Sequence, residues 1–188
     1  MRLFQARDAG GAPRLGVLRD GRALVLQKAH DGVATTLDLF EAQEGRGLDP
    51  RRWLEEAERA GLLAPLGWDD LAAGRGARLG LPVDPPEVWG AGVTYRRSAD
   101  FREEGTGIYD RVYSAERPEL FFKATAWRCV AHGEPIGRRR DSGFTAAEPE
   151  IAIVLGRSGA VLGFTLANDV SAWDIERDNP LYLPQSKV

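Results

Sequence analysis

The sequence has one cysteine, no long apolar run and no excess of positive charge. Cys129 is the only cysteine among 188 residues, which excludes an intrachain disulfide and favours a reducing, cytoplasmic setting. No apolar run is long enough to cross a bilayer, and the first residues, MRLFQARD, lack the apolar core of a signal peptide. The formal net charge of −3 gives no electrostatic reason to expect a nucleic-acid partner. We therefore expect neither a membrane nor a nucleic-acid partner.

The composition that remains is that of a globular protein. Hydrophobic residues make up 43% of the chain and charged residues 28%, which is enough apolar surface to form a core. A Gly/Ala/Arg-rich link, AAGRGARLGLP, leads into VDPPEVWG, where two prolines favour extended chain. We place a boundary near Gly80, between an N-terminal cap (residues 1–80) and a β-rich main domain (residues 81–188).

Turn and cap residues predict the elements of the N-terminal cap. Residues 1–34 contain short strand-like runs, and Asp20-Gly21 between two of them is a hairpin signal. A helix is expected within residues 49–63, with Pro50 near its first turn and Gly61 as its candidate stop. Its apolar face would carry the following side chains: Trp53, Leu54, Ala57 and Ala60.

The main domain contains a polar segment, TYRRSADFREEGTGIYDRVYSAERPE, at residues 94–119. It is charged, contains two glycines and shows weak apolar periodicity. These features are typical of a mobile surface cover rather than of a core element.

An apolar hairpin is expected in the second half of the main domain. We predict strands over residues 150–156 and 160–167, joined by a two-residue loop at Ser158-Gly159. Gly159 would adopt the positive φ that such a loop requires.

Three carboxylates converge at the open end of this hairpin if the register is as assumed. Glu148 would face Asp169, and Glu150 would face Ala167. Because side chains alternate along a strand, Glu148, Glu150 and Asp169 would share one face. A slip by one residue would send Asp169 to the other side.

Like charges at opposed positions are destabilising, and three arrangements would relieve them. The end of the hairpin could be solvated, so that the acids do not crowd. One acid could be protonated. A hard divalent cation could lie among them, because Mg²⁺, Mn²⁺ and Ca²⁺ favour oxygen ligands. Spacing alone does not choose between the solvated end and the cation.

Several separated motifs resemble those of the fumarylacetoacetate hydrolase superfamily. The motifs are EPEIAIVL, NDVSAWDIE and NPLYLPQSK. WGAGVTYRRS, YDRVYSAERPELFFKA and NPLYLPQ resemble its branch of sugar-acid dehydratases, of the 2-keto-3-deoxyarabinonate dehydratase kind. The resemblance covers the chain from about Glu87 to its last residue.

The resemblance implies a fold, a metal and an assembly. The fold would be mixed and β-rich α+β, with a β-roll core and a small N-terminal α/β cap, without the C-terminal part of the family fold. Glu148, Glu150 and Asp169 would hold Mg²⁺ (or Mn²⁺ or Ca²⁺). The protein would form a homodimer or a higher homo-oligomer, and its partner would be a small-molecule 2-oxo acid substrate.

The resemblance also implies catalytic and substrate-binding residues. The family's active-site lysine matches Lys187, which would act either as a base or as a charge that holds the substrate carboxylate. Without the resemblance, Lys187 would be interpreted as a solvent-exposed residue near the end of the chain. Glu119 is the candidate for acid/base work at the leaving hydroxyl, its structural alternative being an ion pair with Arg117 or Lys123. Lys123 and Ser98 would lie near the substrate. Residues 99–113 would form a lid over it.

The implied reaction is the dehydration of a 2-keto-3-deoxy sugar acid. A 2-oxo acid chelates a metal through its carboxylate and keto oxygen, so that an enolate formed at C3 is stabilised and a C4 hydroxyl can leave. Two alternatives are a C–C bond hydrolase of acylpyruvate- or fumarylacetoacetate-like 2-oxo acids and an inactive ligand-binding homologue.

Three departures from the superfamily pattern bear on these alternatives. Ser98 stands where the C–C hydrolases commonly have histidine, and a serine alone activates water poorly, which favours dehydration. Trp173 stands in place of an arginine, whose charge and bidentate geometry tryptophan cannot copy, and this bears on activity and substrate preference. Relatives continue with further strands after the residue that matches Lys187, so either the natural protein extends beyond Val188 or it is a fragment.

Overall fold

The computed structural model describes residues 1–92 and 108–188, which form two compact units. The first unit contains Met1–Pro85, Cys129–Ile136 and Ile151–Ala167. The second unit contains Pro86–Arg128, Gly137–Glu150 and Asn168–Val188. Within the described ranges, no helix has the length and apolar character needed to span a membrane. The division into domains at residues 1–80 and 81–188 stays a prediction.

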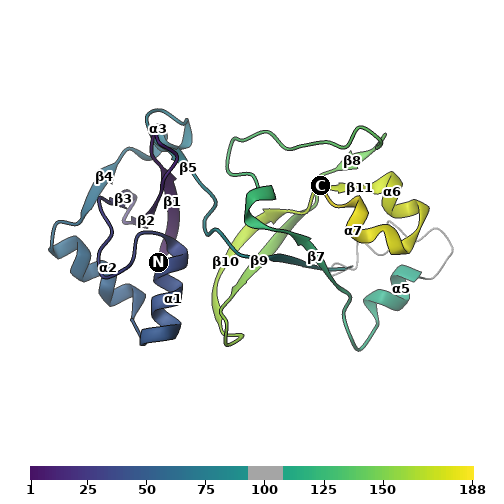
Figure 1. Ribbon diagram of the computed structural model, residues 1–188, viewed down its shortest axis with the longest axis horizontal. Helices are drawn as coiled ribbons and strands as arrows, with labels where there is room; N and C mark the ends of the chain where they lie inside the picture. The colour runs from purple at the N-terminus through teal and green to yellow at the C-terminus, as the bar shows by residue number, and fades with distance from the viewer. Residues whose placement is uncertain (93–107) are drawn as a thin grey trace. The chain divides into compact units, whose positions relative to one another are not determined.

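The first unit contains an antiparallel five-stranded sheet with the order β4-β3-β2-β1-β5 (Figure 1). Asp20 and Gly21 link β2 and β3 with φ values of 50° and 74°, the two positive values that a type I′ turn requires. The predicted hairpin is therefore confirmed. The strands are β1 (Arg2–Arg7), β2 (Pro13–Arg19), β3 (Arg22–Leu26), β4 (Leu63–Leu66) and β5 (Arg78–Leu79).

Three helices cover the two faces of this sheet: α1 (Thr36–Arg46), α2 (Pro50–Arg59) and α3 (Trp68–Ala72). Leu24 and Leu26 of β3 point to the face that α1 and α2 cover, where they join one hydrophobic cluster. The alternate residues, Ala23 and Val25, join a second cluster that contains Leu71 of α3. The period-2 alternation of β3 thus serves a core on each side of the sheet.

The helix predicted over residues 49–63 is confirmed as α2, with a shorter extent. The Asp49 side chain accepts the backbone N–H groups of Arg51 and Arg52, and Pro50 lies in the first turn. The helix ends at Arg59, next to the predicted stop: Gly61 adopts a left-handed φ of 69°, and Leu63 begins β4. Three side chains of its predicted apolar face are buried, whereas Ala60 is exposed.

Helix α1 was not predicted from the sequence. It begins with a capping box, in which the Thr35 hydroxyl accepts the N–H of Asp38 and the Asp38 carboxylate accepts the N–H of Thr35. It ends at Gly47, which has a φ of 66°. Both signals are present in the sequence, as T-x-x-D and a terminal glycine.

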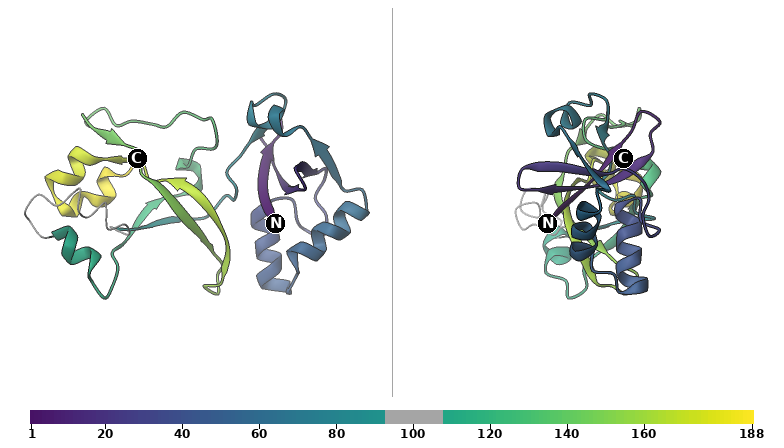
Figure 2. Two further views of the ribbon diagram at one scale, coloured as in Figure 1. Left: turned by 180° about the vertical axis from the view of Figure 1, so that it is seen from behind. Right: turned by 90° about the vertical axis from the view of Figure 1, so that its left-hand side faces the viewer.

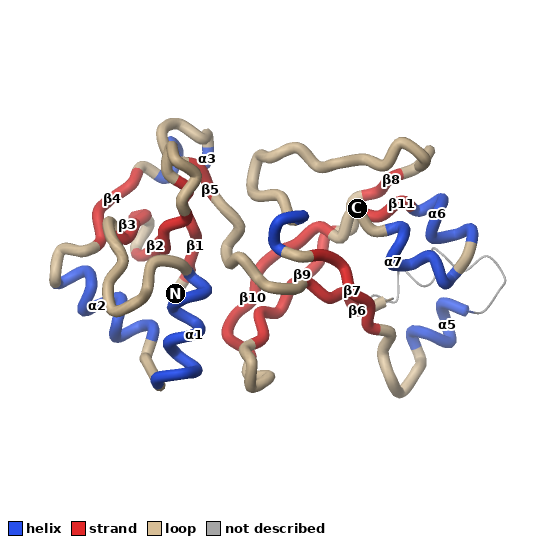
Figure 3. Tube along the Cα trace, viewed as in Figure 1, coloured by secondary structure: helices blue, strands red, loops and turns tan. Residues whose placement is uncertain are grey.

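The second unit contains short strand pairs and short helices (Figure 3). Strand β6 pairs with β7, and β8 pairs with β11, each antiparallel. The strands are β6 (Val88–Ala91), β7 (Leu120–Ala124), β8 (Thr145–Ala146) and β11 (Ser171–Ala172); the helices are α5 (Ile108–Tyr113), η1 (Ala126–Arg128), α6 (Trp173–Asp178), η2 (Pro180–Tyr182) and α7 (Leu183–Ser186).

The predicted apolar hairpin is present as β9 (Pro149–Leu155) and β10 (Val161–Asn168) (Figure 2). Its loop differs from the prediction, because Gly156 N donates to Ala160 O at 2.9 Å and Gly159 N donates to Gly156 O at 3.0 Å. The loop therefore has three residues, with Gly159 at a φ of 81°. A two-residue type I′ loop would also require a positive φ at Ser158, which a serine adopts unfavourably.

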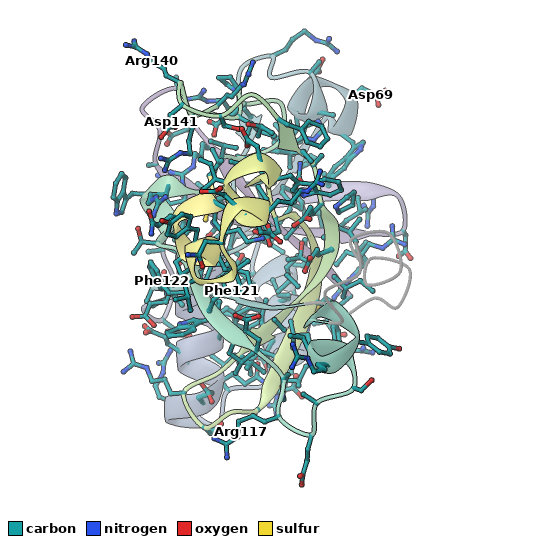
Figure 4. All side chains as sticks on the ribbon, turned by 90° about the vertical axis from the view of Figure 1, so that its right-hand side faces the viewer. Asp69, Arg117, Phe121, Phe122, Arg140 and Asp141 are labelled. Carbon is teal, nitrogen blue, oxygen red and sulfur yellow. The ribbon has the colours of Figure 1, made fainter. Side chains whose placement is uncertain are left out.

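The end of the chain folds back onto the open end of this hairpin. Val188 N donates to Val170 O at 3.0 Å, and Lys187 forms an isolated bridge with Ser171. Helix α7, just before them, contacts β7, which carries Phe121 (labelled in Figure 4). Lys187 is thus built into the second unit and is not a tail residue.

Candidate metal centre and active site

Three acidic side chains meet where β9 begins and β10 ends. Asp169 N donates to Glu148 O at 2.9 Å, so these two residues lie opposite each other, as the assumed register required. Glu148, Glu150 and Asp169 each offer a carboxylate oxygen, and the three oxygens lie within 4.8 Å of one another. All three residues are half-buried. The structure therefore brings together the predicted trio; its role as a set of metal ligands stays a prediction.

Lys187 lies against this acidic trio. Its Nζ is 2.9 Å from Asp169 Oδ2, 3.4 Å from Glu148 Oε2 and 3.7 Å from Glu176 Oε2. The side chain is 3% exposed, and the ammonium group also lies 5.0 Å from the centre of the Phe121 ring. The alternative of an exposed tail lysine is excluded by this burial.

Lys123 contacts the same acidic group from β7. Its Nζ is 2.8 Å from Asp169 Oδ1 and donates to Val170 O at 2.7 Å. Burial lowers the pKa of Lys123, although the Asp169 carboxylate opposes this effect, and the charge of Lys187 lowers it further. Lys123 is therefore an ammonium group with few water contacts, next to one of the candidate metal ligands.

Two uncharged donors hold Glu148. The indole Nε1–H of Trp173 donates to Glu148 Oε1 at 2.8 Å. The hydroxyl of Ser171 lies 3.1 Å from Glu148 Oε2 and 3.0 Å from Asp169 O, two acceptors that share its one proton. The same hydroxyl accepts a hydrogen bond from Lys187 Nζ at 2.7 Å. Trp173 cannot copy the charge of the arginine that the resemblance implies here, but it does supply one hydrogen bond to the site.

The chemistry of these residues fits a hard divalent cation. The site contains four carboxylates, those of the trio and of Glu176, and the ammonium groups of Lys123 and Lys187. Their formal charges sum to −2. Mg²⁺ and Mn²⁺ prefer carboxylate oxygens, and a divalent charge would neutralise this balance. Buried carboxylates without such compensation would be costly.

Glu119 and Ser98 are the remaining predicted site residues. Glu119 is exposed just before β7; its carbonyl oxygen accepts the N–H of Gly92, and its carboxylate lies beside Gly92. The suggested ion pair between Glu119 and Lys123 is not formed, because Lys123 pairs with Asp169. Ser98 lies outside the described residues, as does most of the predicted lid at 99–113, of which α5 contains the last six residues.

Sequence reasoning missed three contributors to the site: Ser171, Glu176 and Phe121. Ser171 is fully buried and Glu176 is 7% exposed. The signal available was weak, since a serine two residues after Asp169 and a glutamate in a short acidic helix are common features. Ser171 lies in β11 and Glu176 in α6, which directly follows β11, so their places in the site depend on how this part of the chain folds.

Two curated proteins are similar to this chain. The 2-dehydro-3-deoxy-D-arabinonate dehydratase of Saccharolobus solfataricus is 53% identical over 118 residues, which are 59% of this chain and 40% of that protein. The probable 2-keto-3-deoxyxylonate dehydratase of Haloferax volcanii is 43% identical over 182 residues, which are 95% of this chain and 60% of that protein. The chain thus spans three fifths or less of these relatives. No family model matches it.

Solved structures show the same relationship. The structure of 2-keto-3-deoxy-D-arabinonate dehydratase complexed with magnesium and 2,5-dioxopentanoate matches with a TM-score of 0.73 and 35% identity, over all of this chain and 61% of that one. Fumarylacetoacetate hydrolase of Exiguobacterium antarcticum matches with a TM-score of 0.57 over 95% of this chain and 58% of that one; at 23% identity it shows the fold alone. The expected fold class is confirmed. The comparisons confirm the resemblance to the fumarylacetoacetate hydrolase superfamily and to its 2-keto-3-deoxyarabinonate dehydratase-like branch.

Proposed function

We propose that the protein is a divalent-metal-dependent dehydratase (a lyase) that removes water from a 2-keto-3-deoxy sugar acid. The observation that carries this proposal is the trio of carboxylates flanked by the buried Lys187 and the partly buried Lys123. The names of the two curated relatives, and the magnesium with which one related structure is complexed, support it. Because the chain spans about three fifths of that structure, the activity is a proposal for this chain.

Glu148, Glu150 and Asp169 would hold the cation, with Mg²⁺ as the first candidate and Mn²⁺ or Ca²⁺ as substitutes. The half-buried position of these acids gives a cation oxygen ligands and leaves the trio partly open to a substrate. When bound, such a cation supplies Lewis acidity toward the keto oxygen of a 2-oxo acid, where negative charge develops.

The lysines would bind and activate the substrate. Lys123 and Lys187 place two positive charges beside the acids, and a substrate carboxylate is the natural partner of such charges. We assign Lys187 Nζ either to removing the proton at C3 or to holding the substrate carboxylate. In the first role it would have to release its own proton before it acts.

Glu119 would complete the reaction at C4. As a general acid it would give a proton to the C4 hydroxyl, so that the C4–O bond breaks and water leaves. Glu119 is exposed, as a group that must reach a bound substrate would be. We further propose that Ser98, outside the described residues, contributes to substrate binding.

A product assay tests the proposal. Purified protein with Mg²⁺ or Mn²⁺ should convert a 2-keto-3-deoxypentonate to a semialdehyde with loss of one water per molecule. Release of pyruvate or of a carboxylic acid from an acylpyruvate would show a hydrolase instead. Cation binding without turnover of either substrate would contradict an enzyme and support a ligand-binding homologue.

We also propose a cytoplasmic homodimer or higher homo-oligomer. Large apolar side chains are exposed along the β9–β10 hairpin, and a second copy could cover them. They are Ile151, Ile153, Leu155, Val161, Phe164 and Leu166. Light scattering after gel filtration measures the mass directly, and a monomer at micromolar concentration would contradict the assembly.

A further inference from the structure

We propose that Trp173 is a positioning residue for cation binding: its indole N–H fixes the orientation of the Glu148 carboxylate. This inference rests on the proposed metal role of Glu148, and it assigns Trp173 a task that neither its position nor its residue type predicts. Trp173 would act through Glu148 and would not contact the substrate.

The two oxygens of Glu148 are held from different sides. Oε1 accepts the indole N–H of Trp173 at 2.8 Å, while Oε2 faces the hydroxyl of Ser171 at 3.1 Å and Nζ of Lys187 at 3.4 Å. A carboxylate held at only one oxygen can rotate about its terminal torsion, which is broad in glutamate. Contacts at both oxygens restrict this rotation and fix the orientation of the carboxylate.

The indole is itself held in place. Its ring meets the Phe144 ring edge to face, with centroids 5.5 Å apart and an interplanar angle of 88°. The backbone N–H of Trp173 donates to Phe144 O at 2.9 Å. Trp173 is the first residue of α6 and directly follows β11, so its backbone lies at a junction of two elements. A donor fixed in this way can orient an acceptor that would otherwise move.

The chemistry of the indole suits this task. The indole Nε1–H is a donor only, and it carries no charge. It therefore leaves the negative charge of Glu148 available to a cation, whereas an ammonium or guanidinium group would compete with that cation. Outer-shell partners of metal ligands typically contribute about 10- to 100-fold to metal affinity.

The test compares Mn²⁺ affinity, measured by calorimetric titration, in variants that separate the N–H from the ring. Trp173→Phe keeps an aromatic ring beside Phe144 and removes the donor, and we expect about tenfold weaker Mn²⁺ binding. Trp173→Leu is a second variant without the donor, in case the first does not fold. Trp173→His restores a ring N–H and should recover part of the lost affinity. Trp127→Phe is the matched control: it makes the same residue change at an exposed tryptophan of η1, so its affinity should equal that of the wild type.

The possible outcomes separate this inference from the proposed function. Unchanged affinity in a folded variant without the donor, or an equal loss in Trp127→Phe, would overturn the role of the N–H while leaving the metal centre intact. If the wild type binds no Mn²⁺, both this inference and the metal-dependent function are overturned. A loss confined to the variants without the donor, with recovery in Trp173→His, supports the inference even if the substrate has been misassigned.

Discussion

Lys187 is the residue at which the charges of the site meet. Its ammonium group is 3% exposed and lies near three carboxylates, two of which belong to the candidate metal ligands. A lysine in this position stabilises the acids when no cation is bound. Its removal leaves an excess of negative charge that Lys123 offsets only in part and that a bound divalent cation would offset further.

Lys187→Met should therefore destabilise the protein and make it more dependent on a divalent cation. We expect a loss of about 3–5 kcal/mol, the usual cost of removing one partner of a buried ion pair. Saturating Mg²⁺ should raise the melting temperature of the variant more than that of the wild type. The exposed Lys28 is the control, since Lys28→Met should change neither quantity appreciably. Equal Mg²⁺ shifts in the wild type and in Lys187→Met would contradict the shared charge balance.

Ser171 connects Lys187 to Glu148, and Ser171→Ala tests this connection. The variant leaves a buried ammonium without one acceptor, which should cost about 1–3 kcal/mol of unfolding free energy in urea denaturation. It should also weaken Mn²⁺ binding, because Glu148 loses a partner. Ser186→Ala is the matched control: Ser186 is equally buried but donates to Leu183 O. Weakened Mn²⁺ binding in both variants would show a general packing effect.

At the scale of elements, helix α6 is tied to the loop before β8 by one carboxylate. Asp174 Oδ1 accepts the Ser142 hydroxyl at 2.7 Å, and Oδ2 accepts the Gly143 N–H at 2.7 Å. The Ser142 bond, helped by the Gly143 bond, holds the pKa of Asp174 below its ordinary value. Asp174 follows Trp173 directly, so this link also bears on the position of the indole.

The lowered pKa of Asp174 predicts a pH dependence of stability. A group with a lowered folded-state pKa contributes stability that is present above its unfolded pKa, about 3.9, and is lost as the pH falls through the folded value. Asp174→Asn should remove this contribution. As the pH falls below about 4, the urea midpoint of the variant should therefore fall less steeply than that of the wild type. Asp178→Asn, on the exposed end of the same helix, should keep the wild-type slope. Identical slopes in wild type and Asp174→Asn would contradict the assignment.

Elements with local signals could be predicted from the sequence, and those without them could not. The β2–β3 hairpin and α2 follow from Asp20-Gly21 and from Asp49-Pro50, whose backbone preferences act within a few residues. The predicted length of the β9–β10 loop was wrong by one residue, because a serine before a glycine is compatible with either loop length until the φ of the serine is known. The register at the open end nevertheless places Glu148 opposite Asp169.

At the scale of the whole molecule, the candidate site draws on residues from β7 to the end of the chain. Spacing could suggest that the acids of one hairpin converge, because strand geometry is regular. It could not show that Lys187, which follows α6, η2 and α7 in the sequence, returns to these acids; only the family resemblance indicated this. The indole of Trp173 was also beyond prediction, because the direction of a side chain at the start of α6 depends on how β11 pairs with β8.

The central claim is that Glu148, Glu150 and Asp169 hold a divalent cation, and calorimetric titration of the protein with Mn²⁺ tests it most directly. We predict saturable binding to one site in the wild type and a loss of affinity of about tenfold or more in Asp169→Asn, which keeps the shape of the side chain. Asp178→Asn should bind as the wild type does. Absence of binding in the wild type, or equal affinity in Asp169→Asn, would contradict the account.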